Sequence, residues 1–140
     1  MGSTYRRKVD AGMFVRIYSV EGQRLGQSFE GFCDCIRDWP GMFVEPDGSL
    51  VWVELAEGAR LQLDGMIYDR GEFIEYLELK GSCTVDGMQR LLSALVPGVS
   101  VAELMEPEWM EWLRIHDLES QLWIDTRELH SLCGRVLESE

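Results

Sequence analysis

Apolar and polar residues alternate along the chain from Met13 to Lys80, and many apolar positions carry Val, Ile, Leu, Phe, Tyr or Trp. Because successive side chains of a β-strand point to opposite faces, this period of two predicts strands with one buried face. Turn residues interrupt the pattern every eight to twelve positions, which is typical of an antiparallel sheet. The predicted strands are 13–20, 28–37, 42–45, 49–56, 59–68 and 72–80.

One turn between these strands is specified by its residues. Pro46 sets the φ angle of the first loop position, Asp47 tolerates the next conformation, and Gly48 accepts a positive φ. This combination predicts a type I turn with a glycine bulge. Strands 42–45 and 49–56 should therefore form a hairpin.

Beyond Ser82 the apolar period changes to that of a helix. Residue Thr84 is a suitable N-cap, and the apolar positions that follow are spaced by three and four residues: Met88, Leu91, Leu92 and Leu95. This pattern predicts a helix over 84–96. Similar patterns predict helices over 100–119, interrupted at Pro107, and over 126–138.

Strands followed by helices predict a single α+β domain over residues 1–140. Its antiparallel sheet of five or six strands spans residues 13–80 and is covered by C-terminal helices over 84–96, 100–119 and 126–138. The first helix and the 59–80 hairpin each have an apolar face to cover. We therefore expect Leu91, Leu92 and Leu95 to pack against Leu61, Leu63 or Leu77.

The chain carries 13 basic and 25 acidic residues, for a net charge of −12. Residues 1–24 hold five of the bases and only two of the acids, so the rest of the chain is strongly acidic. Affinity for nucleic acid comes mainly from Lys and Arg, and we expect no nucleic-acid partner. A basic partner protein suits this charge better.

The sequence predicts a cytoplasmic protein without metal or membrane contact. It has no apolar run long enough to span a bilayer and no apolar segment near its start. The four cysteines, Cys33, Cys35, Cys83 and Cys133, are expected to be reduced thiols. Cys33 and Cys35 are separated by one residue, which is too close for a typical zinc-binding pair.

The 59–80 hairpin carries the one constellation suited to chemistry. A three-residue loop, Asp69-Arg70-Gly71, would set Tyr68 opposite Glu72 and place Asp64 and Glu78 diagonally on one face. Their Cα atoms would then lie roughly 7–8 Å apart, within reach of a shared cation.

An Asp on one strand and a Glu-x-Lys on the next resembles the core of the PD-(D/E)xK nucleases. The matching residues are Asp64, Glu78 and Lys80. The resemblance implies that the two carboxylates would bind Mg²⁺ and that Lys80 would stabilise charge on a phosphate. The same residues also fit the solvated face of an ordinary hairpin, with a surface ion pair between Arg60 and Glu78.

Aromatic residues in the predicted second helix favour a binding surface. Trp109 and Trp112 share a helix face with Glu108 and Glu111 beside them, which gives an apolar patch with an acidic rim. The same face also suits a helix packed on a sheet. We therefore expect a noncatalytic binding or regulatory module with an acidic surface. The alternative is a metal-dependent nuclease or phosphodiesterase that uses Asp64, Glu78 and Lys80.

Overall fold

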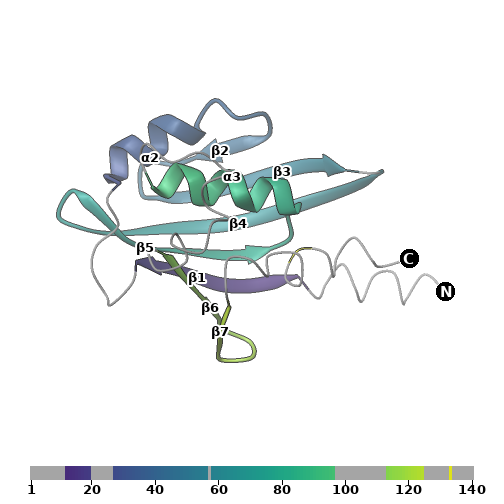
Figure 1. Cartoon of the computed structure of the whole chain (residues 1–140). Helices are drawn as coiled ribbons and strands as arrows, with labels where there is room; N and C mark the ends of the chain where they lie inside the picture. Colours follow the sequence, from purple (N-terminus) through teal and green to yellow (C-terminus); the bar gives the residue numbers. More distant parts are fainter. Residues whose placement is uncertain (1–11, 20–26, 57, 97–112, 125–132, 134–140) are drawn as a thin grey trace.

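The strands of the protein form one antiparallel sheet in the order β2-β3-β4-β5-β1-β6-β7 (Figure 1). The computed structural model describes residues 12–19, 27–56, 58–96, 113–124 and 133. The strands are β1 (Met13–Ser19), β2 (Met42–Val44), β3 (Ser49–Ala56), β4 (Ala59–Arg70), β5 (Phe73–Gly81), β6 (Leu113–Asp117) and β7 (Leu122–Ile124). The described helices are α2 (Phe29–Ile36) and α3 (Val85–Leu95). An antiparallel α+β architecture is confirmed, but the prediction of a sheet of five or six strands within residues 13–80 is wrong, because the described sheet has seven strands and includes β6 and β7.

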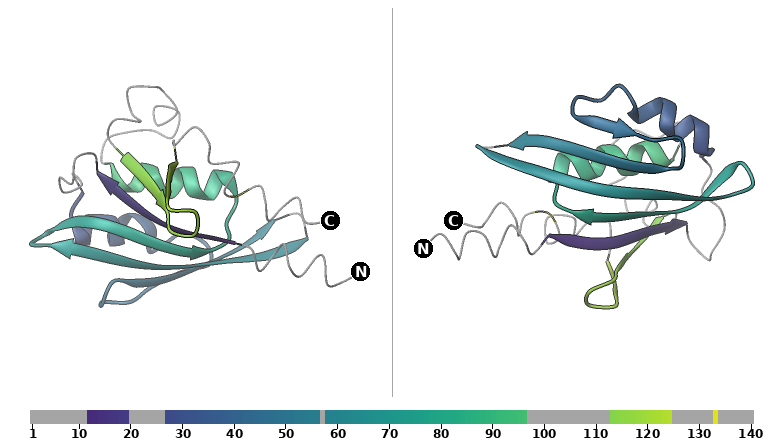
Figure 2. Two further views of the ribbon diagram at one scale, coloured as in Figure 1. Left: turned by 90° about the horizontal axis from the view of Figure 1, so that it is seen from below. Right: turned by 180° about the vertical axis from the view of Figure 1, so that it is seen from behind.

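Both described helices lie on the same face of the sheet, as the views in Figure 2 show. This face is apolar, because the alternate residues of the central strands that point toward the helices are hydrophobic. Residues Leu63, Leu77, Leu91, Leu92 and Leu95 are buried in one continuous core cluster. All five side chains belong to this one core, as expected if the 84–96 helix packs on the hairpin.

The predicted helix over 84–96 is α3, and its start is held by side chains. The Thr84 hydroxyl accepts a hydrogen bond from the Gly87 N–H and donates one of 3.0 Å to the Glu54 carboxylate. The same carboxylate accepts a 2.8 Å bond from the Thr84 N–H, so β3 holds the helix by its cap. No helix in the described ranges is long and apolar enough to cross a membrane.

The prediction of a strand over 28–37 is wrong, because residues Phe29–Ile36 form α2. Ser28 caps this helix by accepting a hydrogen bond of 2.9 Å from the Gly31 N–H. The buried residues Phe32, Cys33 and Ile36 have helical spacing and join the core. Phe32 and Ile36 alone would also fit the period of two of a strand, but Cys33 directly follows Phe32 and can share its buried face only on a helix.

The prediction of a helix over 100–119 is wrong at its C-terminal end, where Leu113–Asp117 form β6. β6 pairs with β1, and Ile115 lies opposite Ile17, so that both side chains are buried in the core. Residues 97–112, 125–132 and 134–140 lie outside the described ranges, and most of the predicted 100–119 and 126–138 helices falls there. Within 126–138 the structure describes Cys133, which is buried.

The register predicted for the 59–80 hairpin is also wrong. The loop is two residues long, because Arg70 pairs with Phe73, and the register shifts by one between Tyr68 and Asp69. Ile74 and Leu77 are both fully buried although they are three residues apart. A regular strand cannot place two such residues on one face, so a β-bulge is needed between them.

A leucine of α3 and a leucine of β3 test the core directly. We expect Leu92→Ala to lower the free energy of unfolding by about 2–5 kcal/mol, because its fully buried side chain would leave a cavity. Leu55→Ala is the matched control, since Leu55 is 83 % exposed. Urea denaturation of both variants measures the difference, and equal midpoints would contradict the burial of Leu92 in the core.

Candidate functional site

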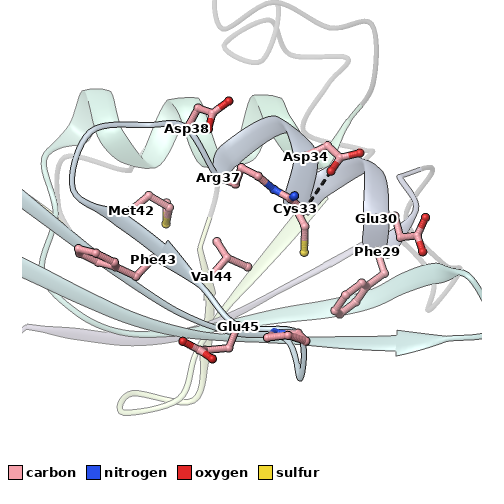
Figure 3. Close-up of a pocket in the computed structure, with 11 residues that line it drawn as sticks. Phe29, Glu30, Cys33, Asp34, Arg37, Asp38, Met42, Phe43, Val44 and Glu45 are labelled. Atoms are coloured by element: carbon pink, nitrogen blue, oxygen red, sulfur yellow. Dashed lines mark ion pairs between the residues drawn. The ribbon is translucent and has the colours of Figure 1, made fainter.

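A hollow of about 630 Å³ lies between α2 and β2, at the end of the sheet (Figure 3). Side chains from α2, from the turn that follows it and from β2 and its following turn line the hollow. The lining residues are Phe29, Glu30, Cys33, Asp34, Arg37, Asp38, Met42, Phe43, Val44, Glu45 and Pro46. The hollow is therefore built from two segments that are close in sequence and joined by one tight turn.

The turn between α2 and β2 is anchored to the sheet. The Trp52 indole donates a 3.0 Å hydrogen bond to the Pro40 carbonyl, and the Trp52 ring contacts Trp39 with centroids 5.2 Å apart. Gly41 has a φ of 79°, and a Cβ at this position would overlap the carbonyl oxygen of Val53. A glycine is required here, and it lets the turn approach the backbone of β3 closely.

The other end of the hollow is held by backbone hydrogen bonds. The Phe29 N–H donates to the Glu72 carbonyl at 3.0 Å, which attaches the start of α2 to the loop between β4 and β5. The predicted turn at Pro46-Asp47-Gly48 is present, with a φ of 97° at Gly48. Hydrogen bonds from the Ser49 N–H and hydroxyl to the Asp47 carboxylate stabilise this turn and hold the pKa of Asp47 below its ordinary value.

The hollow combines an apolar floor with an acidic rim. Its apolar part includes Phe29, Met42 and Val44. Its charged residues are Glu30, Asp34, Asp38, Glu45 and Arg37. The single guanidinium is already paired, because Arg37 Nη2 lies 3.0 Å from Asp34 Oδ1. The rim therefore has an excess of negative charge.

Cys33 points into this hollow from α2 (Figure 3). Burial raises the pKa of its thiol, which keeps the group neutral at physiological pH. A neutral thiol is a poor nucleophile and a poor metal ligand. Cys33 therefore acts as a small apolar residue in the floor of the hollow.

The three residues of the predicted metal site share the helix-free face of the sheet, which is the face opposite α2 and α3 that no helix within the described residues covers. Asp64 lies directly across from Lys80, and Glu78 is the diagonal neighbour of Asp64. The diagonal relation expected from the sequence is present, although it arises from a different register. The Asp64 carboxylate is exposed and accepts a 3.2 Å hydrogen bond from the Gln62 amide.

Glu78 and Lys80 have other neighbours in the structure. Glu78 Oε1 accepts a hydrogen bond of 2.8 Å from Arg16 Nε, and contacts with Tyr18 and Glu78 raise the pKa of Arg16. The Lys80 ammonium lies 5.5 Å from the centre of the Phe14 ring. Within the described ranges, no group of three His, Cys, Asp or Glu side chains is placed to hold a metal ion.

A row of aromatic rings in contact, which was not predicted from the sequence, crosses the same helix-free face. Tyr68 stacks on Tyr76 with centroids 4.5 Å apart, Tyr76 contacts Tyr18 at 5.1 Å, and Tyr18 contacts Trp123 at 5.8 Å. His116 stacks on Trp123 at 4.6 Å, so the row extends across β4, β5, β1, β6 and β7. Such cross-strand pairs stabilise the sheet.

The predicted binding residues Trp109, Trp112, Glu108 and Glu111 lie outside the described residues. The hollow between α2 and β2 was not predicted, because residues 28–37 were expected to form a strand. The spacing of Phe29, Phe32, Cys33 and Ile36 was the available signal for the missing helix.

The turn that forms one end of the hollow can be tested with two glycines. We expect Gly41→Ala to destabilise the protein more than Gly58→Ala, although both glycines have a φ of 79°. Both variants carry the cost of a positive φ, roughly 1–2 kcal/mol. Gly41→Ala must also displace the Val53 carbonyl, whereas no atom lies within 4 Å of a Cβ at Gly58. Thermal melting compares the two, and equal losses would show that this close approach is absent.

Comparisons with known proteins do not assign the chain to a family. No family model, curated protein or solved structure matches it. Its function must therefore be inferred from the chemistry of its own surfaces.

Proposed function

We propose that the protein is a noncatalytic binding module that holds a basic segment of a partner protein in the hollow between α2 and β2. This proposal rests on the charge of the hollow, because four carboxylates line its rim and its one guanidinium is already paired with Asp34. A net charge of −12 for the whole chain supports the same partner, because it favours approach of a basic protein.

Lysine and arginine side chains match both parts of the hollow. Their alkyl stems can cover apolar groups such as Phe29 and Val44, while their charged ends remain at the wet rim near Glu30 and Asp38. An acidic or neutral segment would leave the carboxylates without partners. In this proposal the protein acts in the cytosol, where thiols such as Cys33 stay reduced.

A probe of defined sequence tests this proposal. We expect an acetylated and amidated heptapeptide of alternating lysine and valine to bind, and the matched glutamate and valine peptide not to bind. Binding should weaken as salt is raised, because the screening length falls from about 10 Å at 0.1 M salt to about 3 Å at 1 M. Isothermal titration calorimetry measures both peptides.

Two charge reversals locate the binding surface. Asp38→Lys changes the rim of the hollow, whereas Glu119→Lys makes the same charge change in the turn between β6 and β7, at the opposite end of the sheet. We expect Asp38→Lys to weaken binding of the lysine peptide and Glu119→Lys to leave it nearly unchanged. Equal weakening by both would mean that only the overall charge matters, and no binding at all would refute the proposed function.

A second function, metal-dependent cleavage of phosphodiesters, is supported by one observation. Asp64, Glu78 and Lys80 share one sheet face, with Asp64 across from Lys80 and diagonal to Glu78. In this alternative Asp64 and Glu78 would hold Mg²⁺. The ion pair between Arg16 and Glu78 favours the binding module instead, because it already neutralises one of the two carboxylates.

Metal addition separates the two functions. We expect Mg²⁺ or Mn²⁺ to leave the melting temperature nearly unchanged and to elicit no cleavage of DNA or RNA. If the carboxylates formed a built site, metal at 100 times its dissociation constant would stabilise the fold by about 2.7 kcal/mol. Stabilisation lost in Asp64→Ala, together with cleavage lost in Lys80→Ala, would establish the nuclease function in place of the binding module.

A further inference from the structure

The free edge of β2 lies beside the hollow and can form hydrogen bonds with the backbone of a partner's segment. We propose that the partner's basic segment binds as an added β-strand on the free edge of β2, beside α2, an inference that rests on the proposed function of the hollow. β2 is the terminal strand of the sheet, and β3 is its neighbour on one side. No described strand pairs with its other side.

The hydrogen bonds of β2 show which backbone groups face the free edge. The Gly41 carbonyl accepts a bond from the Val53 N–H, and the Glu45 N–H donates to the Ser49 carbonyl, so these residues face β3. Backbone groups alternate in direction along an antiparallel strand, and Phe43 therefore faces β3 as well. Met42 and Val44 face away from β3.

Three backbone groups of β2 are available to an added strand. The Met42 N–H already donates to the Trp39 carbonyl at 3.1 Å. The Met42 carbonyl and both backbone groups of Val44 face the free edge, and no described residue pairs with them there. An extended peptide can use these groups in the recurring mode of strand addition.

The geometry limits the length of the added segment. β2 has three residues, Met42–Val44, between the anchored turn at Gly41 and the turn that begins at Pro46. At about 3.3 Å per residue, an added segment of three to five residues would span roughly 10–17 Å. The site therefore fits a short extended segment rather than a long strand.

The surroundings of β2 also determine the side chains of the segment. Residues of an added strand would point alternately to the helix-covered face and to the opposite face of the sheet. Those on the helix side would meet the acidic rim that includes Glu30, Asp34 and Asp38 (Figure 3). Those on the other side would lie beside the exposed ring of Phe43. The structure thus favours a segment in which basic and apolar residues alternate.

Amide hydrogen exchange tests the strand addition at one atom. Adding the lysine and valine heptapeptide should slow exchange of the Val44 amide by about tenfold or more, because its N–H gains a partner. The Phe43 amide is the internal control, since it already faces β3 and should change less. Binding without protection of Val44 would overturn the strand addition and leave the proposed function standing.

Backbone methylation of the peptide gives an independent test. Two peptides are compared, one methylated on its odd-numbered backbone nitrogens and one on its even-numbered ones. We expect one of them to lose affinity by about tenfold or more, because its methyl groups replace the N–H groups that face β2, and the other to bind as before. Recognition by charge alone would give both methylated peptides the same affinity, and that result would contradict strand addition. Failure of even the unmethylated peptide to bind would instead contradict the proposed function.

A substitution in β2 completes the test. Val44→Pro removes an N–H that faces the free edge while sparing the hydrogen bonds to β3, and Val44→Thr keeps the N–H with a similar shape. We expect Val44→Pro to lose peptide binding and Val44→Thr to retain it, each at a temperature where melting shows a folded protein. Equal affinity of the two variants for the peptide would overturn the proposal. If Val44→Pro does not fold, hydrogen exchange of the Val44 amide in the unaltered protein tests the proposal instead.

Discussion

Five side chains from three neighbouring strands, Val15, Ile17, Leu63, Leu77 and Leu79, share one face of the sheet and are completely buried. Burial of such a side chain contributes roughly 1.5–3 kcal/mol, so this face must be covered for the domain to fold. α3 covers its central strands and α2 its β2 end. The position of α2, and with it the hollow beside β2, thus follows from the need to cover apolar surface.

The parts of the fold that local patterns specify were predictable from the sequence. The turn at Gly48 and the helix that begins after Thr84 depend on residues within a few positions of each other, and both are present. α2 and β6 depend on distant partners. Ile115 is placed in a strand because β1 offers Ile17 opposite it, and nothing near Ile115 in the sequence encodes that pairing. The bulge in β5 was also not predicted. The spacing of Ile74 and Leu77 requires it, but the prediction assumed a regular strand.

The candidate site was less predictable than the fold, for a related reason. Its acidic rim combines residues of α2 with Glu45, which follows β2, so a strand assignment for 28–37 removes the site entirely. The acidic composition of the chain is consistent with the acidic rim of the hollow, and the basic partner inferred from both is a proposal. In the Asp64, Glu78 and Lys80 cluster, the sequence predicted the shared face but not the ion pair that occupies Glu78. Arg16 lies on β1, and its pairing with β5 is a long-range contact.

The carboxylates at the rim of the hollow would affect how fast the protein meets a basic partner. Glu30 and Asp38 lie beside α2 at the β2 end, whereas Glu78 on the helix-free face is already neutralised by Arg16. In the proposed complex, the attraction between the rim and a positively charged segment would act before contact and would orient the partner as it diffuses toward the hollow. The resulting orientational bias raises the rate of association at low ionic strength and is lost as salt screens the charges.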